Sequence, residues 1–109
     1  MRGSWRVHWR LTIGDKLFKN NGKLVNLDLD TNKITTIPRK TFYNLVDLEI
    51  LLLDNNLLTE VPVYLFRNNK KLRCLDLRWN NLSEENKKEI RLAYSWIGRC
   101  DSGWSGLCL

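Results

Sequence analysis

The sequence predicts an α/β fold, a short solenoid with parallel strands on one face, irregular or 3-10 return segments on the other, and a C-terminal capping helix. Leucine recurs at one constant interval along the chain, at Leu24, Leu48 and Leu72. After residue 82 this spacing gives way to the spacing of an amphipathic helix. Because 109 residues suffice for one domain, we expect a single unit over 1–109.

Repeated segments occupy residues 24–47 and 48–71, and a third copy at 72–82 supplies a strand and a turn. The copies share leucines, then an asparagine, then another aliphatic residue. The further matching positions are Leu27, Leu51 and Leu75; Leu29, Leu53 and Leu77; Asn32, Asn56 and Asn80; and Ile34, Leu58 and Leu82. One repeat cannot bury its own leucines, so neighbouring repeats must stack.

Each repeat is expected to contribute one short strand. In runs such as "LDL" the alternation puts both leucines on one face and the residue between them on the other. Stacked copies then pair as parallel strands about 4.8 Å apart. Burial of each leucine between neighbouring repeats contributes about 1.5–3 kcal/mol.

Asparagine stands where the chain must leave each strand. Its amide both donates and accepts, so it can pair backbone groups that the turn leaves without partners, each of which would otherwise cost about 1–3 kcal/mol. We therefore expect Asn32, Asn56 and Asn80 to form an asparagine ladder.

Proline and phenylalanine mark the return segments. Pro38 and Pro62 open them, since a proline needs no partner for a backbone N–H. Phenylalanine recurs at the same interval as the leucines. The next position of this series is Ile90, and we expect a phenylalanine stack behind the leucines, formed by Phe18, Phe42 and Phe66.

The shared pattern, LxxLxLxxNx(I/L)xx(I/V)PxxxFxxLxxL, resembles the leucine-rich repeat (LRR) family in its typical 24-residue class. The resemblance covers residues 15–82. It implies a solenoid whose strands line a concave face. Because such arrays chiefly serve recognition, it also implies a non-enzymatic scaffold that binds a protein or peptide there.

A capping helix is predicted over residues 83–97. Ser83 suits the N-cap, and Glu84 and Glu85 lie in the first turn, where acidic groups favour the helix dipole. This ending resembles that of small bacterial LRR proteins. Residues 98–109 are rich in Gly and Ser and are expected to form a loose tail.

Residues 1–23 are interpreted as a degenerate repeat that acts as an N-terminal cap. A shift by one repeat puts Trp5 in the slot of Leu29 and His8 in that of Asn32. Such an edge leaves two structural alternatives open: self-association through the edge, or membership of a longer array that this chain closes.

The net charge of +6 is concentrated near the N-terminus. Residues 1–23 hold six bases and one acid, whereas residues 24–82 hold eight bases and seven acids. A solvated end is the favoured interpretation. The alternative is a basic N-terminal segment that binds nucleic acid or an anionic membrane.

The three cysteines, Cys74, Cys100 and Cys108, form an odd set. Cys100 and Cys108 would pair if the chain were exported, but free thiols and a cytoplasmic location are favoured. One histidine and no phosphate loop leave no catalytic or metal-binding constellation, so we expect no enzyme, cofactor, metal or small-molecule substrate.

The partner-binding residues are predicted from the repeat frame. Ile50 and Leu52 occupy slots that face away from the leucines, beside acidic residues and Trp79, and an apolar centre ringed by charge is typical of a protein-binding patch. Exposed aliphatic residues without any partner are the alternative. The predicted set is Asn26, Asp28, Asp30, Ile50, Leu52, Asp54, Asp76, Arg78 and Trp79.

Overall fold

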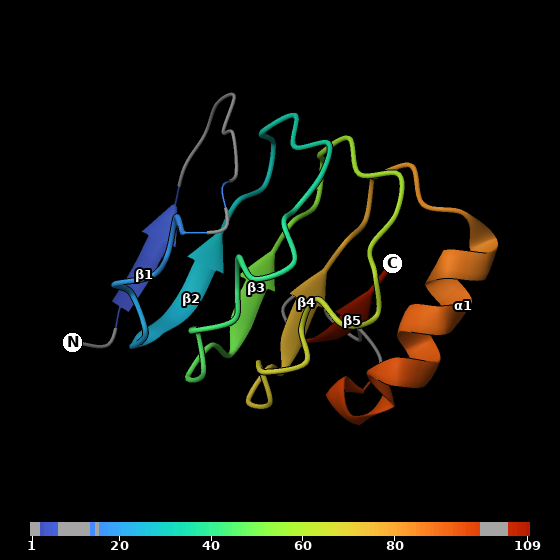
Figure 1. The fold of residues 1–109 in the computed structure, drawn as a ribbon. Helices are drawn as coiled ribbons and strands as arrows, with labels where there is room; N and C mark the ends of the chain where they lie inside the picture. Colours follow the sequence, from blue (N-terminus) through green and yellow to red (C-terminus); the bar gives the residue numbers. More distant parts are fainter. Residues whose placement is uncertain (1–2, 7–13, 15, 99–104) are drawn as a thin grey trace.

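Five parallel strands form one sheet in chain order, as Figure 1 shows. The structure, a computed structural model, describes residues 3–6, 14, 16–98 and 105–109, the first of these segments by its backbone. The strands are β1 (Gly3–Arg6), β2 (Leu24–Asp28), β3 (Ile50–Leu52), β4 (Cys74–Asp76) and β5 (Gly106–Cys108). The predicted parallel stack is confirmed.

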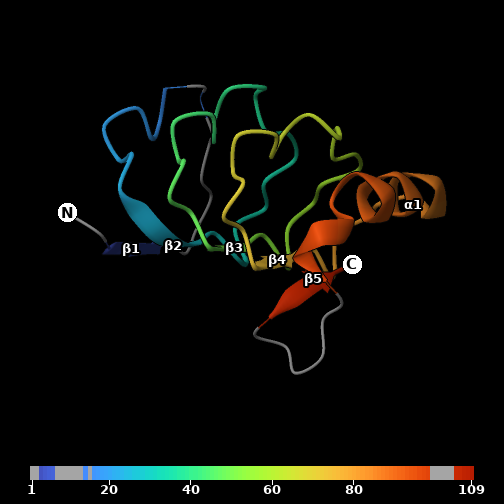
Figure 2. The same ribbon diagram turned by 90° about the horizontal axis from the view of Figure 1, so that it is seen from below.

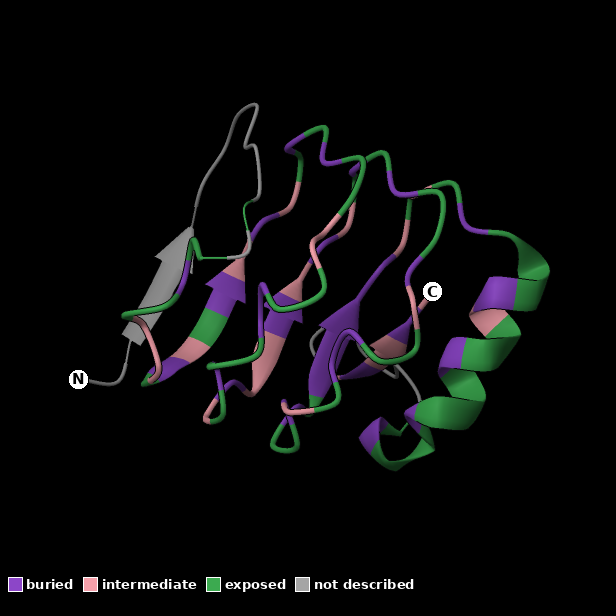
Figure 3. Ribbon diagram, viewed as in Figure 1, coloured by how far each residue is buried: buried purple, intermediate pink, exposed green. Residues whose placement is uncertain are grey.

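The repeat period fixes the register of the central strands. Leu27 pairs with Leu51, and Leu51 with Leu75, so that equivalent positions of successive repeats face each other. All three side chains are fully buried, and Figure 3 shows buried positions along each of the strands β2 to β4. Each leucine layer is therefore sealed by the layers beside it.

The return segments form a second layer opposite the strands, which Figure 2 shows edge-on. They consist of tight turns, such as those in which the N–H of Thr41 donates to Pro38 O and that of Leu65 to Pro62 O, both at 3.1 Å. Stacked rings lie inside this layer, with centroid distances of 6.1 Å from Phe18 to Phe42 and 6.0 Å from Phe42 to Phe66.

The N-terminal strand has a different register from the one that the sequence predicts. In β1, Trp5 pairs with Leu27 and does not occupy the slot of Leu29. The interval between these two partners is shorter than the interval from Leu27 to Leu51, so the first repeat is shorter than the others. His8 and the side chains of Arg2, Arg6 and Arg10 lie outside the described residues, whereas Lys16, Lys19 and Lys23 of the basic N-terminal segment are described and exposed.

The cap is an α-helix followed by a single 3-10 turn, and the prediction of one helix over 83–97 was too long. Helix α1 spans Glu84–Ala93 and η1 spans Ser95–Ile97. Ser83 is the N-cap, and its side chain accepts a hydrogen bond from Asn86 N. Neither described helix has the length and apolar character needed to cross a bilayer.

Tyr94, and not Ile90, continues the phenylalanine stack. Its ring meets Phe66 edge-on at 5.6 Å. Ile90 is fully buried in the core but makes no ring stack. The repeat spacing does not hold in the helix, because a helical residue advances the chain by a different distance from a residue in a strand. The ring that packs next to Phe66 is therefore not one repeat length further along the chain.

The prediction of a loose tail over 98–109 is wrong at its end. Residues 106–108 form β5, which completes the sheet beside β4. The N–H of Leu77 donates to Cys108 O and that of Gly106 to Arg73 O, both at 2.7 Å. Without β5, the edge of β4 would expose unpaired backbone groups. The Gly and Ser content of the tail did not reveal that residues 106–108 would pair with them.

Candidate functional site

The concave face is formed by the outward side chains of the strands and of the turns that follow them. The register aligns Asn26, Ile50 and Cys74 in one row. The next row holds Asp28, Leu52 and Asp76. Both rows follow from the register that the repeat spacing predicts. We use the name concave face for these rows and for the residues that continue them, which are Asp30, Asp54, Arg78, Thr31, Asn55 and Trp79.

The asparagine ladder holds the rim of this face in place. Asn56 Oδ1 accepts hydrogen bonds from the N–H groups of Asn32 and Ile34, both at 3.0 Å. Asn56 Nδ2 donates to the carbonyls of Leu29 and Leu53, both at 3.0 Å. One buried side chain thus ties two neighbouring repeats together where the strands end.

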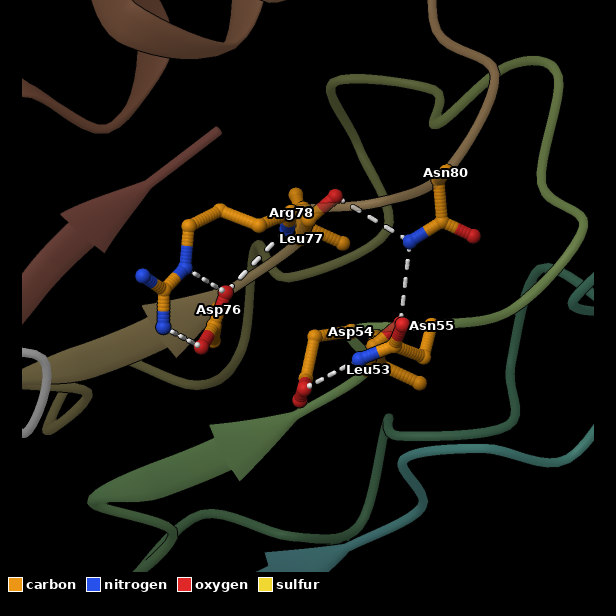
Figure 4. A network of polar contacts seen from close by, with 7 residues as sticks. All are labelled: Leu53, Asp54, Asn55, Asp76, Leu77, Arg78 and Asn80. Atoms are coloured by element: carbon orange, nitrogen blue, oxygen red, sulfur yellow. Dashed lines mark hydrogen bonds and ion pairs between the residues drawn. The ribbon is translucent and has the colours of Figure 1, made fainter.

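Asn80 repeats the arrangement one repeat later, as Figure 4 shows. Its Nδ2 donates to Leu53 O at 3.0 Å and to Leu77 O at 3.1 Å. Its Oδ1 accepts from the N–H of Leu58 at 3.0 Å. These hydrogen bonds therefore fix the position of the turn after β4 relative to the turn after β3.

The residue before each ladder asparagine has a left-handed backbone. Thr31, Asn55 and Trp79 have φ values of 58°, 57° and 57°. Asparagine tolerates this conformation, whereas it is a genuine outlier for a bulky residue such as tryptophan. Trp79 is nevertheless 65% exposed, so burial of its ring does not compensate for its backbone.

Arg78 ties two neighbouring side chains into one unit. Its guanidinium binds Asp76 through two bonds, Nε to Oδ1 at 3.0 Å and Nη2 to Oδ2 at 2.8 Å (Figure 4). The same guanidinium lies over the Trp79 ring, 5.0 Å from its centroid. The ion pair raises the pKa of Arg78 and holds it charged. Asp76 and Arg78 therefore fix the ring plane of the exposed tryptophan.

Asp54 lies beside this unit and has a perturbed carboxyl group. Burial and then the negative charge of Asp76 raise the pKa of Asp54 above its ordinary value of 3.8. Asn55 Nδ2 donates to Asp54 Oδ2 at 3.1 Å and opposes this shift (Figure 4). A cation brought here by a partner would relieve the repulsion that Asp54 experiences.

Two side chains of these rows are buried, and one of them, Asp76, was predicted as a contact residue. Cys74 is 0% exposed and Asp76 is 4% exposed. Every residue of β4 is buried, whereas β3 keeps Ile50 and Leu52 half-exposed, although each of the two strands lies between two neighbouring strands. Burial, followed by the charge of Asp76, raises the pKa of the Cys74 thiol, which disfavours a reactive thiolate.

The remaining cysteine finding corrects the expectation of free thiols. Cys74 is free, but Cys108 is disulfide-bonded. Cys100, the partner that the sequence suggests for it, lies outside the described residues.

The acidic residues at the end of β2 have local partners. Asp28 Oδ1 accepts from the N–H of Asp30 at 3.2 Å, and Asp30 Oδ2 accepts from the Thr31 hydroxyl at 3.3 Å. Within the described ranges, no three His, Cys, Asp or Glu side chains are placed to hold a metal ion.

Two buried asparagines outside the repeat pattern were not predicted. Asn69 Nδ2 donates to the carbonyls of Phe42 and Leu45, both at 2.9 Å. Asn86 Oδ1 accepts from Val61 N at 2.8 Å, and Asn86 Nδ2 donates to Val61 O at 3.0 Å. Asn86 thereby docks the helix onto the last full repeat. The sequence signal that could have indicated this contact is the position of Asn86 in the helix, shortly after the N-cap.

The comparison with protein families agrees with the geometry. Two family models, both described as leucine rich repeat, match residues 11–58 and 71–93. The chain is a leucine-rich repeat protein. LRR domains generally mediate protein–protein interaction and are typically non-enzymatic modules. None of the curated proteins compared with this LRR chain matches it.

Proposed function

We propose that this LRR protein binds a protein or peptide segment on its concave face, between Leu52 and Trp79. One observation carries the proposal. Trp79 is 65% exposed although its backbone has the left-handed φ of 57°, and the Asp76–Arg78 pair orients its ring. A strained residue persists only where the surroundings over-determine it, and such residues cluster at binding sites. Tryptophan is also among the residues that most often anchor interfaces.

The chemistry of the face suggests the character of the partner segment. Ile50 and Leu52 are half-exposed and provide an apolar floor. Asp54 beside them carries a negative charge that burial, and then the charge of Asp76, destabilises. A partner with an aliphatic or aromatic side chain next to a lysine or arginine would satisfy both features. Asn26, Asp28 and Asp30 would form the polar rim of the same contact.

Selection from a random peptide display library would test the proposal. Peptides selected on the wild-type protein should combine basic and apolar residues, and they should lose affinity for Leu52→Asp. Leu92→Asp is the matched control, because Leu92 is exposed on the outer side of α1. Selected peptides that bind Leu52→Asp as tightly as the wild type would place the contact elsewhere.

Trp79→Asn separates binding from folding. Asparagine accepts a left-handed backbone, so the free energy of unfolding should rise by about 1 kcal/mol. The same substitution removes the exposed ring, so the selected peptides should bind at least about tenfold more weakly. Urea denaturation and fluorescence anisotropy measure the two effects. A gain in stability with unchanged affinity would exclude Trp79 as an anchor.

A further inference from the structure

The outer side of the return segments has a composition opposite to that of the concave face. Residues 38–47 and 62–71 contain five bases and one acid, Asp47, which pairs with Lys71 at 2.9 Å. Exposed aromatic residues lie among these bases. We call this surface the convex basic face and define it by Arg39, Lys40, Tyr43, Val46, Val63, Tyr64, Arg67, Lys70 and Trp96, all exposed.

Two adjoining hollows show that these residues form one continuous surface. A hollow of about 210 Å³ lies between the two return segments and is lined by residues that include Arg39, Tyr43 and Tyr64. A second hollow, of about 590 Å³, reaches from Val63 to Trp96 at the end of the cap. Arg67 lines both hollows.

Contacts between the two return segments position the residues that line the first hollow. The Arg39 guanidinium lies over the Tyr64 ring, 4.8 Å from its centroid, and joins one return segment to the next. Asn68 Nδ2 donates to Tyr43 O at 3.2 Å across the same boundary. The bases are thus displayed in a defined arrangement on neighbouring turns.

The basic surface continues towards the N-terminus. The positions one repeat before Lys40 and Tyr43 are Lys16 and Lys19, and both are exposed. Four of the aspartates, in contrast, lie on the concave face, at Asp28, Asp30, Asp54 and Asp76. The two faces of the solenoid therefore carry opposite charge.

We propose that the convex basic face docks on the surface of an anionic phospholipid bilayer. Clustered lysine and arginine residues are attracted to acidic headgroups by about 1 kcal/mol each. Tyrosine and tryptophan favour the boundary between headgroup and acyl chain, because one end of each ring is apolar and the other is polar. The proposal is independent of the concave face, which stays free for a partner.

The details of the face favour lipid over single-stranded nucleic acid. Stacking of bases needs free aromatic rings, but Arg39 already covers one face of Tyr64 and the Trp96 ring packs against Tyr94. Val46 and Val63 are 52% and 39% exposed and would add apolar contact with lipid. They offer nothing to a phosphate or a base.

Sedimentation with vesicles tests the proposal on the full chain. The protein should bind phosphatidylserine-containing vesicles at low salt, release them at high salt, and ignore vesicles of pure phosphatidylcholine. The triple variant Lys40→Ser, Arg67→Ser, Lys70→Ser should bind about a hundredfold more weakly, at about fivefold for each base. Because all three side chains are exposed, its circular dichroism melt should match that of the wild type.

A matched triple variant controls for net charge. Lys33→Asn, Lys87→Ser, Lys88→Ser removes three bases that lie outside the convex basic face, and asparagine suits the left-handed φ of 60° at position 33. It should keep its affinity for the acidic vesicles. Equal losses in the two triple variants would overturn the proposal, since net charge alone would then explain binding.

Two further results would also overturn it. One is equal binding to neutral and acidic vesicles. The other is tight binding of oligothymidylate together with no binding to acidic vesicles, which would assign the face to nucleic acid. Tyr43→Ala with Val46→Ser leaves the charge unchanged and should weaken vesicle binding several-fold, by about 1 kcal/mol of lost apolar contact.

Discussion

Asparagine has several distinct structural roles in this chain, and position decides among them. Asn56 is buried and bridges two repeats through its amide, whereas its neighbour Asn55 is exposed and adopts a left-handed backbone. Asn86 mimics a backbone partner for Val61. The same side chain therefore supports turns, rim and cap, because it both donates and accepts.

Asn56→Leu should destabilise the protein although it adds apolar volume. The substitution leaves the N–H groups of Asn32 and Ile34 and the carbonyl of Leu29 without this partner. Leu29 O keeps its hydrogen bond from Asn32 Nδ2, so the two N–H groups are the ones that lose their acceptor. Because each stranded group costs about 1–3 kcal/mol, we expect a loss of at least about 2 kcal/mol in the free energy of unfolding. Asn55→Gly should be nearly neutral in the same urea denaturation experiment. A stable Asn56→Leu would contradict the ladder.

Asp54→Asn should raise stability at neutral pH. The pKa of Asp54 is raised in the folded state, so its proton favours folding below its ordinary value of 3.8, and this contribution disappears as the pH rises through the folded value. The variant should therefore be more stable than the wild type at pH 7 and equally stable under strongly acidic conditions. Chemical denaturation across this pH range measures the difference. A difference that is independent of pH would exclude the ionisation of Asp54 as the cause.

At the scale of elements, the cap replaces the next repeat by different means. Helix α1 buries Ile90 against the core, and Asn86 pairs with the Val61 backbone. The Tyr94 hydroxyl donates to Val63 O and accepts from Phe66 N. The helix thus forms hydrogen bonds with backbone groups of the last return segment. In the middle of the array, the next repeat would lie against such groups.

Tyr94→Phe should loosen this cap without changing its shape. It removes both hydroxyl contacts while keeping the ring against Phe66, so we expect a loss of about 1–3 kcal/mol. Burial raises the pKa of Tyr94 above 10.0, so the wild type should also lose stability as the pH rises above that value, and the variant should lose less. Tyr43→Phe, on an exposed ring, serves as the control. Thermal melts at neutral and alkaline pH give both comparisons.

At the scale of the whole molecule, stacking buries the leucines and separates the charges. The leucine layers are sealed by their neighbours, and the strands and return segments present opposite surfaces. The near balance of charge over residues 24–82 hides this separation, because four of the seven acids lie on the concave face and five of the eight bases lie in the return segments. The separation of charge becomes visible when Lys40, Arg67 and Lys70 are assigned to the return segments of the repeats. Counting charges along the chain does not reveal it.

Leu51→Asp should unfold the chain. Leu51 lies between Leu27 and Leu75 and is fully buried, so the substitution places an unpaired carboxylate between two leucine layers. Because a domain is stable by only about 5–15 kcal/mol, this one charge exceeds what the fold can tolerate. Leu57→Asp, at an exposed leucine, should fold normally. Circular dichroism of the two purified proteins decides the outcome.

Features that depend on periodicity within a repeat could be predicted from sequence. Strand alternation determines which face Leu51 and Leu52 occupy, and the constant repeat spacing places Asn56 beside Asn32. Ser83 could be recognised because a helix cap is a local interaction. Of the candidate site, the repeat spacing predicted the alignment of the rows across the sheet, but not which members of the rows are exposed.

The sequence by itself determined the stacked fold, its strand register from Leu24 onward, and the two opposing surfaces, since each follows from a pattern repeated along the chain. Tertiary structure alone decided the pairing of Trp5 with Leu27, the strand at 106–108, the burial of Cys74 and the place of Tyr94 beside Phe66. Each of these lies at an end of the stack. At the ends, no further repeat packs against the stack. The unpaired backbone groups and the apolar surface there are covered by whichever segment of the chain can reach them.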